Sequence, residues 1–214
     1  MTRKRTKKEN SKISVIERWD KPFEYFGFLN LVLMAFYYGS LWFSATPLDA
    51  DKVFKFSLLM GFEFIMVHSG VFMVAFSARI SLFIFFPVYG LFAYSFQSIM
   101  GFSDWTITTL YCVTVFNRMR FAFFNTSEAV QQRVMAQSVV AVMLYFFLAM
   151  FVAFGQNIVP EFALDEGFRK SQSYLDAKKH GGLFLDFPHT AIALGTLYFS
   201  FLALFDLSLI RKMK

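Results

Sequence analysis

The feature that most constrains this chain is a series of long apolar runs, each close to the length of a membrane-spanning helix. A helix needs about 20 largely apolar residues, within a range of about 17–25, to cross a bilayer. The runs are Tyr25–Ala45, Val53–Phe76, Ile80–Met100, Trp105–Phe124, Val134–Gly155 and Pro188–Ile210. Because backbone groups inside lipid must bond within their own segment, the sequence predicts an all-α, polytopic membrane bundle with about six transmembrane helices.

The fourth run is the weakest of the series. Asn117, Arg118 and Arg120 interrupt its second half, so a five-helix protein in which 105–124 re-enters on the same side is the alternative. Composition supports a membrane protein in either case. The chain is 57% hydrophobic and 17% charged, whereas soluble domains have about 45–50% apolar and about 25% charged residues. A soluble domain of this size has too little interior to hide so much apolar surface.

The basic residues give an independent test of how the chain threads the bilayer. Six helices with the amino terminus inside place most of the 21 Lys and Arg residues in the cytoplasm, and short cytoplasmic loops carry such an excess. Five helices would instead put the basic ending "RKMK" outside. We therefore predict cytoplasmic termini in a multi-pass protein of the bacterial inner membrane. The lipid bilayer is its first expected partner.

Two parts of the chain stand apart from the spans. Residues 1–22 form a basic cytoplasmic tail, which we interpret as a topology signal rather than as a site for nucleic acid or for anionic lipid. Residues 23–214 form a single transmembrane domain, whose long outer loop, 156–187, is predicted to contain a short amphipathic helix. That helix either lies on the outer membrane surface or contacts a partner. Its helical spacing is carried by Leu164, Phe168, Ser171 and Leu175.

Small residues and one proline predict how the helices pack. Small residues four apart let helix backbones approach closely in lipid. Such pairs are Ala35/Gly39, Ala149/Ala153 and Ala191/Gly195. Pro87 lies inside the third run, where it removes a backbone donor and should bend the helix.

Polar residues inside the spans are the candidate site. A rise of about 1.5 Å per residue places several of them at a similar depth in a core of about 30 Å. They are Glu63, His68, Asn117, Arg118, Tyr145 and Tyr198. Glu63 and His68 are five residues apart, about 140° around a helix, so they should face different neighbours. Arg118 is the predicted partner of Glu63, because an unpaired charge at that depth costs about 3 kcal/mol or more. Nearer the cytoplasm, Asp206 is expected to pair with Arg211.

No recognisable catalytic or metal-binding pattern accompanies this cluster. The sequence lacks a nucleophile elbow, a phosphate-binding loop, a dinucleotide fingerprint and a CxxC pair,. Cys112 is the single cysteine. His68 and His189 lie roughly 20 Å apart along the bundle by helical rise, too far to ligate one haem. We therefore predict no catalytic residues, no cofactor and no metal, and the balance is against an enzyme.

Three functions are compatible with these features. The favoured hypothesis is an accessory or assembly subunit of a larger membrane complex, with other membrane subunits or further copies of itself as partners. In that case the polar cluster fixes how the helices pack. The alternative is a small proton- or ion-coupled transporter or channel centred on Glu63 and His68, because intramembrane ionisable residues mark such pathways. A second alternative is a membrane enzyme acting on lipid or quinone.

Overall fold

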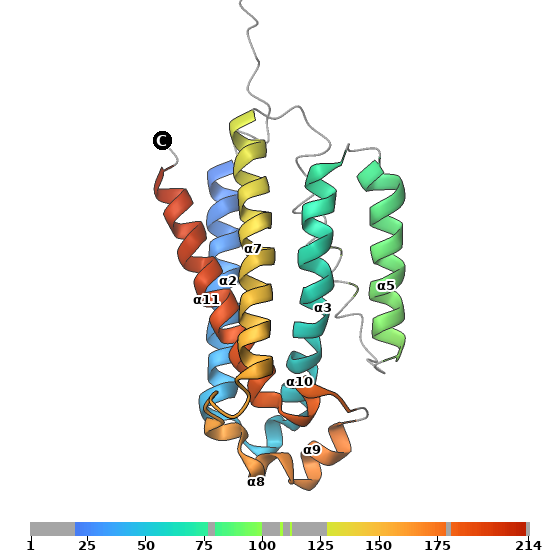
Figure 1. Ribbon diagram of the computed structural model, residues 1–214, viewed down its shortest axis with the longest axis vertical. Coiled ribbons are helices and arrows are strands. Elements are labelled where there is room, and N and C mark those ends of the chain that lie inside the picture. The colour runs from blue at the N-terminus through green and yellow to red at the C-terminus, as the bar shows by residue number, and fades with distance from the viewer. Residues whose placement is uncertain are drawn as a thin grey trace, which may run out of the picture.

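The computed structural model describes residues 20–76, 80–99, 108, 112, 128–178 and 181–212. Its long helices lie side by side, and short helices close one end of the bundle (Figure 1). The long elements are α2 (Asp20–Ser44), α3 (Ala50–Ala75), α5 (Phe86–Ile99), α7 (Glu128–Phe154) and α11 (Pro188–Lys212). The described residues contain no strand, which confirms the all-α prediction for this part of the chain.

Three helices are long and apolar enough to cross a membrane, as judged over the described residues. They comprise residues 21–44, 132–154 and 188–210, and they correspond to the first, fifth and sixth apolar runs. α3 overlaps the second run, and α5 covers the last two thirds of the third run. Most of the fourth run and the basic tail 1–19 lie outside the described residues.

α2 packs mainly on α11, and glycine makes that approach possible. A Cβ atom added at Gly195 would lie only 2.4 Å from the nearest ring carbon of Tyr38, and one at Gly39 would lie 3.7 Å from Thr196. Two of the small-residue pairs read from the sequence therefore contribute to this helix contact.

Pro87 follows a local widening of the third long helix. The π-helical turn η2 (Ser81–Phe85) directly precedes α5. Proline has no N–H to bond the carbonyl four residues earlier, here that of Phe83. A wider turn is one way to shift the hydrogen bonds around such a gap.

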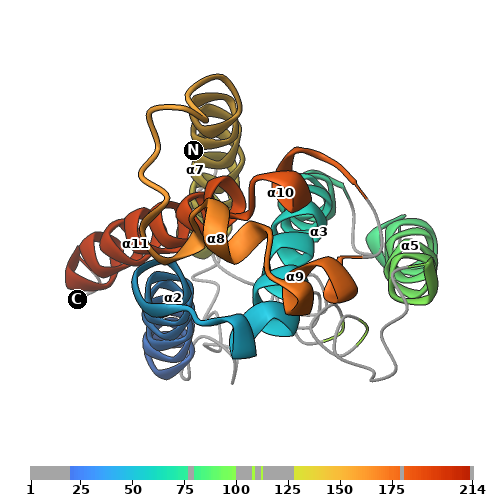
Figure 2. The ribbon, with the colours of Figure 1, turned by 90° about the horizontal axis from the view of Figure 1, so that it is seen from below.

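The outer loop forms a folded cap, which we define as residues 155–178 and 181–187. It contains the short helices η3 (Phe162–Leu164), α8 (Glu166–Arg169), α9 (Gln172–Ala177) and α10 (Leu183–Asp186). Together with η1 (Pro47–Asp49), the cap lies across one end of the bundle (Figure 2). We call this the cap end; the opposite end, where α2 and α7 begin and α11 ends, is the tail end.

The cap differs from the single amphipathic helix expected from the sequence. Ser171 adopts an extended backbone and its hydroxyl accepts a hydrogen bond from the Tyr174 N–H, so it separates α8 from α9 as an N-cap,. Phe168 and Tyr174 are buried, whereas Leu175 is 49% exposed. The apolar face of the cap is thus directed onto the bundle.

Candidate functional site

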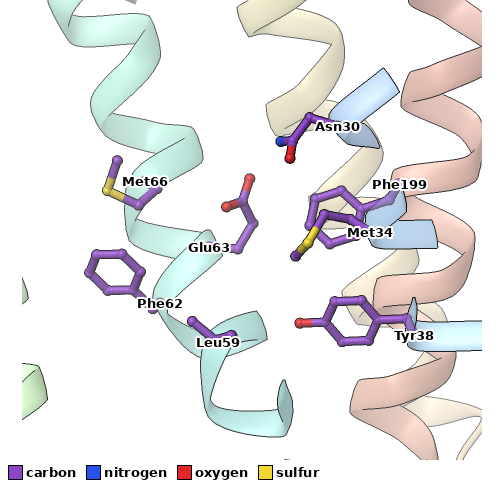
Figure 3. Close-up of a pocket in the computed structure, with 8 residues that line it drawn as sticks. All are labelled: Asn30, Met34, Tyr38, Leu59, Phe62, Glu63, Met66 and Phe199. Atoms are coloured by element: carbon purple, nitrogen blue, oxygen red, sulfur yellow. The ribbon is translucent and has the colours of Figure 1, made fainter. Parts of the chain in front are cut away.

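Glu63 extends from α3 toward α2 and α11 (Figure 3). The Tyr198 hydroxyl on α11 donates a hydrogen bond to Glu63 Oε1 at 3.1 Å. Tyr198 is fully buried, and Glu63 is half-buried. A carboxylate and a phenol from two different helices therefore meet inside the apolar bundle.

A small cavity borders Glu63 between α2 and α3. Its volume is about 110 Å³, room for roughly three waters at about 30 Å³ each. Its lining comprises Asn30, Met34, Tyr38, Leu59, Phe62, Glu63, Met66 and Phe199. Sites for drug-sized ligands occupy about 300–1,000 Å³, so this cavity is too small for a substrate of that size.

Three buried tyrosines connect the helices around Glu63. Tyr38 on α2 donates its hydroxyl hydrogen to the Phe56 carbonyl at 3.0 Å, and Tyr145 on α7 donates to the Met60 carbonyl at 2.6 Å. The rings of Tyr145 and Tyr198 meet edge to face, with their centroids 5.4 Å apart. α3 is thereby joined to α2, α7 and α11 through hydroxyl groups.

The structure brings together only some of the predicted site residues that it describes. Glu63, Tyr145 and Tyr198 form one cluster. His68 is directed elsewhere: its Nδ1 lies 2.6 Å from the Phe64 carbonyl of its own helix, and its ring packs on Phe64. Asn117 and Arg118 lie outside the described residues, so the Glu63–Arg118 pair stays a prediction.

Asn30 and Tyr38 were missed from the sequence. Both are polar residues inside the first apolar run, and that position was the signal that could have identified them. These two residues of the first run share the cavity with Glu63 of the second.

A second polar cluster occupies the tail end of the bundle. The Gln137 amide on α7 donates to Glu24 Oε2 at 3.0 Å and to Asp206 Oδ1 at 3.2 Å. Arg133 lies 3.7 Å from Glu24 Oε1. The expected pairing of Asp206 with Arg211 is wrong, because the Gln137 amide reaches the Asp206 carboxylate from the neighbouring helix.

The cap end is fixed mainly by bonds to backbone carbonyls. Trp42 Nε1 donates to the Pro160 carbonyl at 2.8 Å, and His189 Nε2 donates to the Gln156 carbonyl at 3.1 Å. Tyr174 donates to the Leu185 carbonyl at 2.9 Å, and burial raises the pKa of the Tyr174 hydroxyl, which keeps it protonated. These bonds attach the cap to α2, α11 and itself.

The cap also contains charged contacts. Arg169 Nη2 donates to Glu161 Oε1 at 2.8 Å, with the Arg169 side chain 19% exposed. Lys178 Nζ bonds Asp186 Oδ1 at 2.7 Å, and the Gly182 N–H donates to Asp186 Oδ2 at 2.9 Å. The Lys178 bond, and next the Gly182 bond, lower the pKa of Asp186. The described residues include no group of three or more His, Cys, Asp and Glu side chains placed to hold a metal.

No family model, curated protein or solved structure matches this chain. The described residues nevertheless define a class: an all-helical bundle with helices of membrane-spanning length and composition. Inside it, one ionisable side chain is held by a tyrosine of another helix.

Proposed function

We propose that this chain is a multi-pass protein of the bacterial inner membrane, with about six transmembrane helices and cytoplasmic termini. Large apolar side chains cover its long helices: Phe36 is 75% exposed, Phe83 74% and Phe147 60%. Exposing such surface to water costs about 25 cal/mol per Å², whereas lipid removes that cost. The distribution of basic residues supports the orientation.

Within the membrane, we propose that it is an accessory or assembly subunit of a larger membrane complex, or of an oligomer of this chain. One observation carries this proposal: polar groups in the described interior are used to join helices. The hydroxyls of Tyr38, Tyr145 and Tyr198 each bond to α3. Such bonds fix helix packing in lipid, where the alternative is an unsatisfied polar group.

The second candidate is a small proton- or ion-coupled transporter or channel. Its support is the placement of Glu63 beside a cavity of about 110 Å³ that also contains the Asn30 amide. Intramembrane ionisable residues often mark proton relays. His68 bonds to its own helix, so this candidate centres on Glu63. For the enzyme hypothesis, the described residues offer no supporting contact.

Glu63→Gln separates the two candidates. Glutamine keeps the size of the side chain and an acceptor for Tyr198, but it cannot exchange a proton. Wild type and variant are compared for accumulation in the membrane, for proteins that copurify in mild detergent, and for proton flux into proteoliposomes. The matched control is His68→Gln, which changes an ionisable residue of the same helix.

The subunit proposal predicts stoichiometric membrane-protein partners and no flux above empty liposomes. Glu63→Gln should then reduce accumulation or partner recovery more than His68→Gln does. The transporter candidate predicts flux by the wild type that disappears in Glu63→Gln while the protein accumulates normally. Purification of a monomer without flux would contradict both.

A further inference from the structure

The cavity beside Glu63 has two unlike sides. Asn30 and Tyr38 line it from the same helix, and Asn30 precedes Tyr38 by eight residues, which places it about 12 Å nearer the tail end. The Asn30 side chain is exposed, whereas Tyr38 is completely buried. Figure 3 shows the two residues on opposite sides of Glu63. On its tail side the cavity is therefore bordered by the exposed, polar Asn30 and by the buried Met66, and on its cap side it is closed by an aromatic ring.

The closure on the cap side continues through the bundle. Tyr38 is held by the Phe56 carbonyl and packs on Phe199 with ring centroids 5.5 Å apart. Beyond it the core includes Val53 and Leu194, both completely buried. The cap then covers the end of the bundle with buried apolar residues such as Leu164. Water entering from this direction would have to displace a packed core.

Polar groups continue toward the tail end instead. Glu24 lies six residues before Asn30, roughly 9 Å closer to that end of α2. There the Gln137 amide connects Glu24 to Asp206, beside Arg133. Charged and amide side chains of α2, α7 and α11 thus meet between the tail-end surface and the level of Asn30, on helices that also bury the apolar Val134 and Ile210 there.

The contents of the cavity favour water and a proton over a metal ion. Calcium takes six to eight oxygen ligands, and magnesium requires near-octahedral coordination. The lining offers one carboxylate, one amide and one phenol hydroxyl that is already bonded to a carbonyl. A buried water needs about two to four polar partners, which these groups can supply.

We infer that the Glu63 cavity is a hydrated proton-exchange site that is reached from the tail end and sealed from the cap end. The proton moves between a water molecule and a Glu63 carboxylate oxygen, and no other bond changes. This inference deepens the second candidate function and rests on it, because a proton path needs a defined side of entry. The inference adds to that candidate the end from which Glu63 is reached, and it names water and a proton as the ligands.

Cysteine accessibility in the full-length chain tests the direction of access. In a Cys112→Ala background, single cysteines replace Asn30 and Glu63, and membrane vesicles of both orientations are treated with a cationic, membrane-impermeant methanethiosulfonate. Lys52→Cys marks the cap end and Arg211→Cys the tail end, since both residues are exposed. Ser57→Cys, at a completely buried position of α3, is the unreactive control.

The expected result is that Asn30→Cys and Glu63→Cys react at least about tenfold faster from the side that labels Arg211→Cys, because the other route requires opening of the packed core. Equal rates from both sides, faster reaction from the Lys52→Cys side, or no reaction while Arg211→Cys is labelled would each overturn the inference. If the Glu63→Cys variant accumulates too poorly to be labelled, the labelling rates of Asn30→Cys alone show the side of access. One-sided labelling without proton flux would contradict the transporter candidate while leaving hydrated access in place.

Discussion

The two ends of the bundle are stabilised by different chemistry. At the cap end, neutral indole, imidazole and phenol groups donate to backbone carbonyls of Pro160, Gln156 and Leu185. At the tail end, one amide connects two carboxylates beside an arginine. Neutral bonds to a carbonyl can be enclosed in a dense core at little electrostatic cost, whereas charged groups retain water around them. Glu24 is itself buried, so the tail end depends on the Gln137 and Arg133 contacts that satisfy this carboxylate.

The substitution Gly195→Ala, at the contact between α2 and α11, should have the largest effect on stability. The new Cβ would lie 2.4–2.7 Å from ring atoms of Tyr38, and that ring is fixed by its bond to Phe56. Overpacking of this kind costs about 1–3 kcal/mol, and we expect the upper part of that range. Thermal unfolding in detergent measures it. Gly61→Ala, where an added Cβ meets nothing within 4 Å, should not destabilise; equal losses in both variants would refute close α2–α11 packing.

The next test addresses the tail end through Gln137→Leu. Leucine removes the donor shared by Glu24 and Asp206 and leaves two carboxylates facing each other. Hydrogen bonds to charged groups contribute about 1.5–3 kcal/mol, and partial hydration should reduce the loss to about 2 kcal/mol. Denaturant unfolding is the measurement, and Gln132→Leu, at an exposed position one turn earlier, is the control. An unchanged midpoint would show that the tail end does not depend on this amide.

Trp42→Phe should release the cap with a smaller effect. Phenylalanine keeps most of the ring contact with Phe162, whose centroid lies 5.1 Å from that of Trp42, but it loses the donor to Pro160. One neutral hydrogen bond contributes about 1 kcal/mol. Hydrogen exchange should therefore quicken at amides of α8 and α9 while α7 is unaffected. Tyr37→Phe, on the same helix, should leave the cap amides unchanged, and exchange that quickens throughout the bundle would contradict a local role.

The smallest expected effect is a loss of cap stability at low pH. The pKa of Asp186 is lowered by its bonds to Lys178 and Gly182, so the stabilisation is complete above the unfolded pKa of about 4 and is lost as pH falls through the folded pKa. The pair is exposed, and such pairs contribute about 0.5 kcal/mol or less. Cap amides of the wild type should exchange faster as pH drops from about 5 to 3, after correction for intrinsic rates. Asp186→Asn should remove this step, Asp176→Asn should retain it, and a retained step in Asp186→Asn would exclude this carboxylate.

The long helices could be predicted because the order of apolar residues along the chain is enough to indicate them. A run of apolar residues specifies α2 and α11 within a few positions. α7 begins at Glu128, six residues before the apolar run that starts at Val134, because "EAVQQR" contains good helix formers that are not apolar,. Apolarity locates the part of a helix suited to lipid, while helix propensity extends it further.

The level of the site residues along the bundle could be predicted from the sequence, but the neighbour that each side chain faces could not. Helical rise alone placed Glu63 and Tyr198 at one level, and the structure joins them. Which neighbour each side chain faces depends on how helices rotate against one another, and for α2 and α11 this is set by Gly195 and the Tyr38 ring. In the cap, helical spacing suggested one helix, but the Ser171 side chain competes for backbone bonds and starts a new one,.

The pairing of the first and last long helices has a consequence for how the protein is made. Trp42 bonds to Pro160, 118 residues later in the chain, and the main partner of α2 is α11. Gly39 of α2 approaches Thr196 of α11, 157 residues later in the chain, and at about 5–20 residues per second a ribosome needs about 8–31 s to make that length. During this interval the Gly39 side of α2 lacks the partner that it has in the finished fold. A truncated chain that stops before Pro188 should therefore leave this side of α2 uncovered.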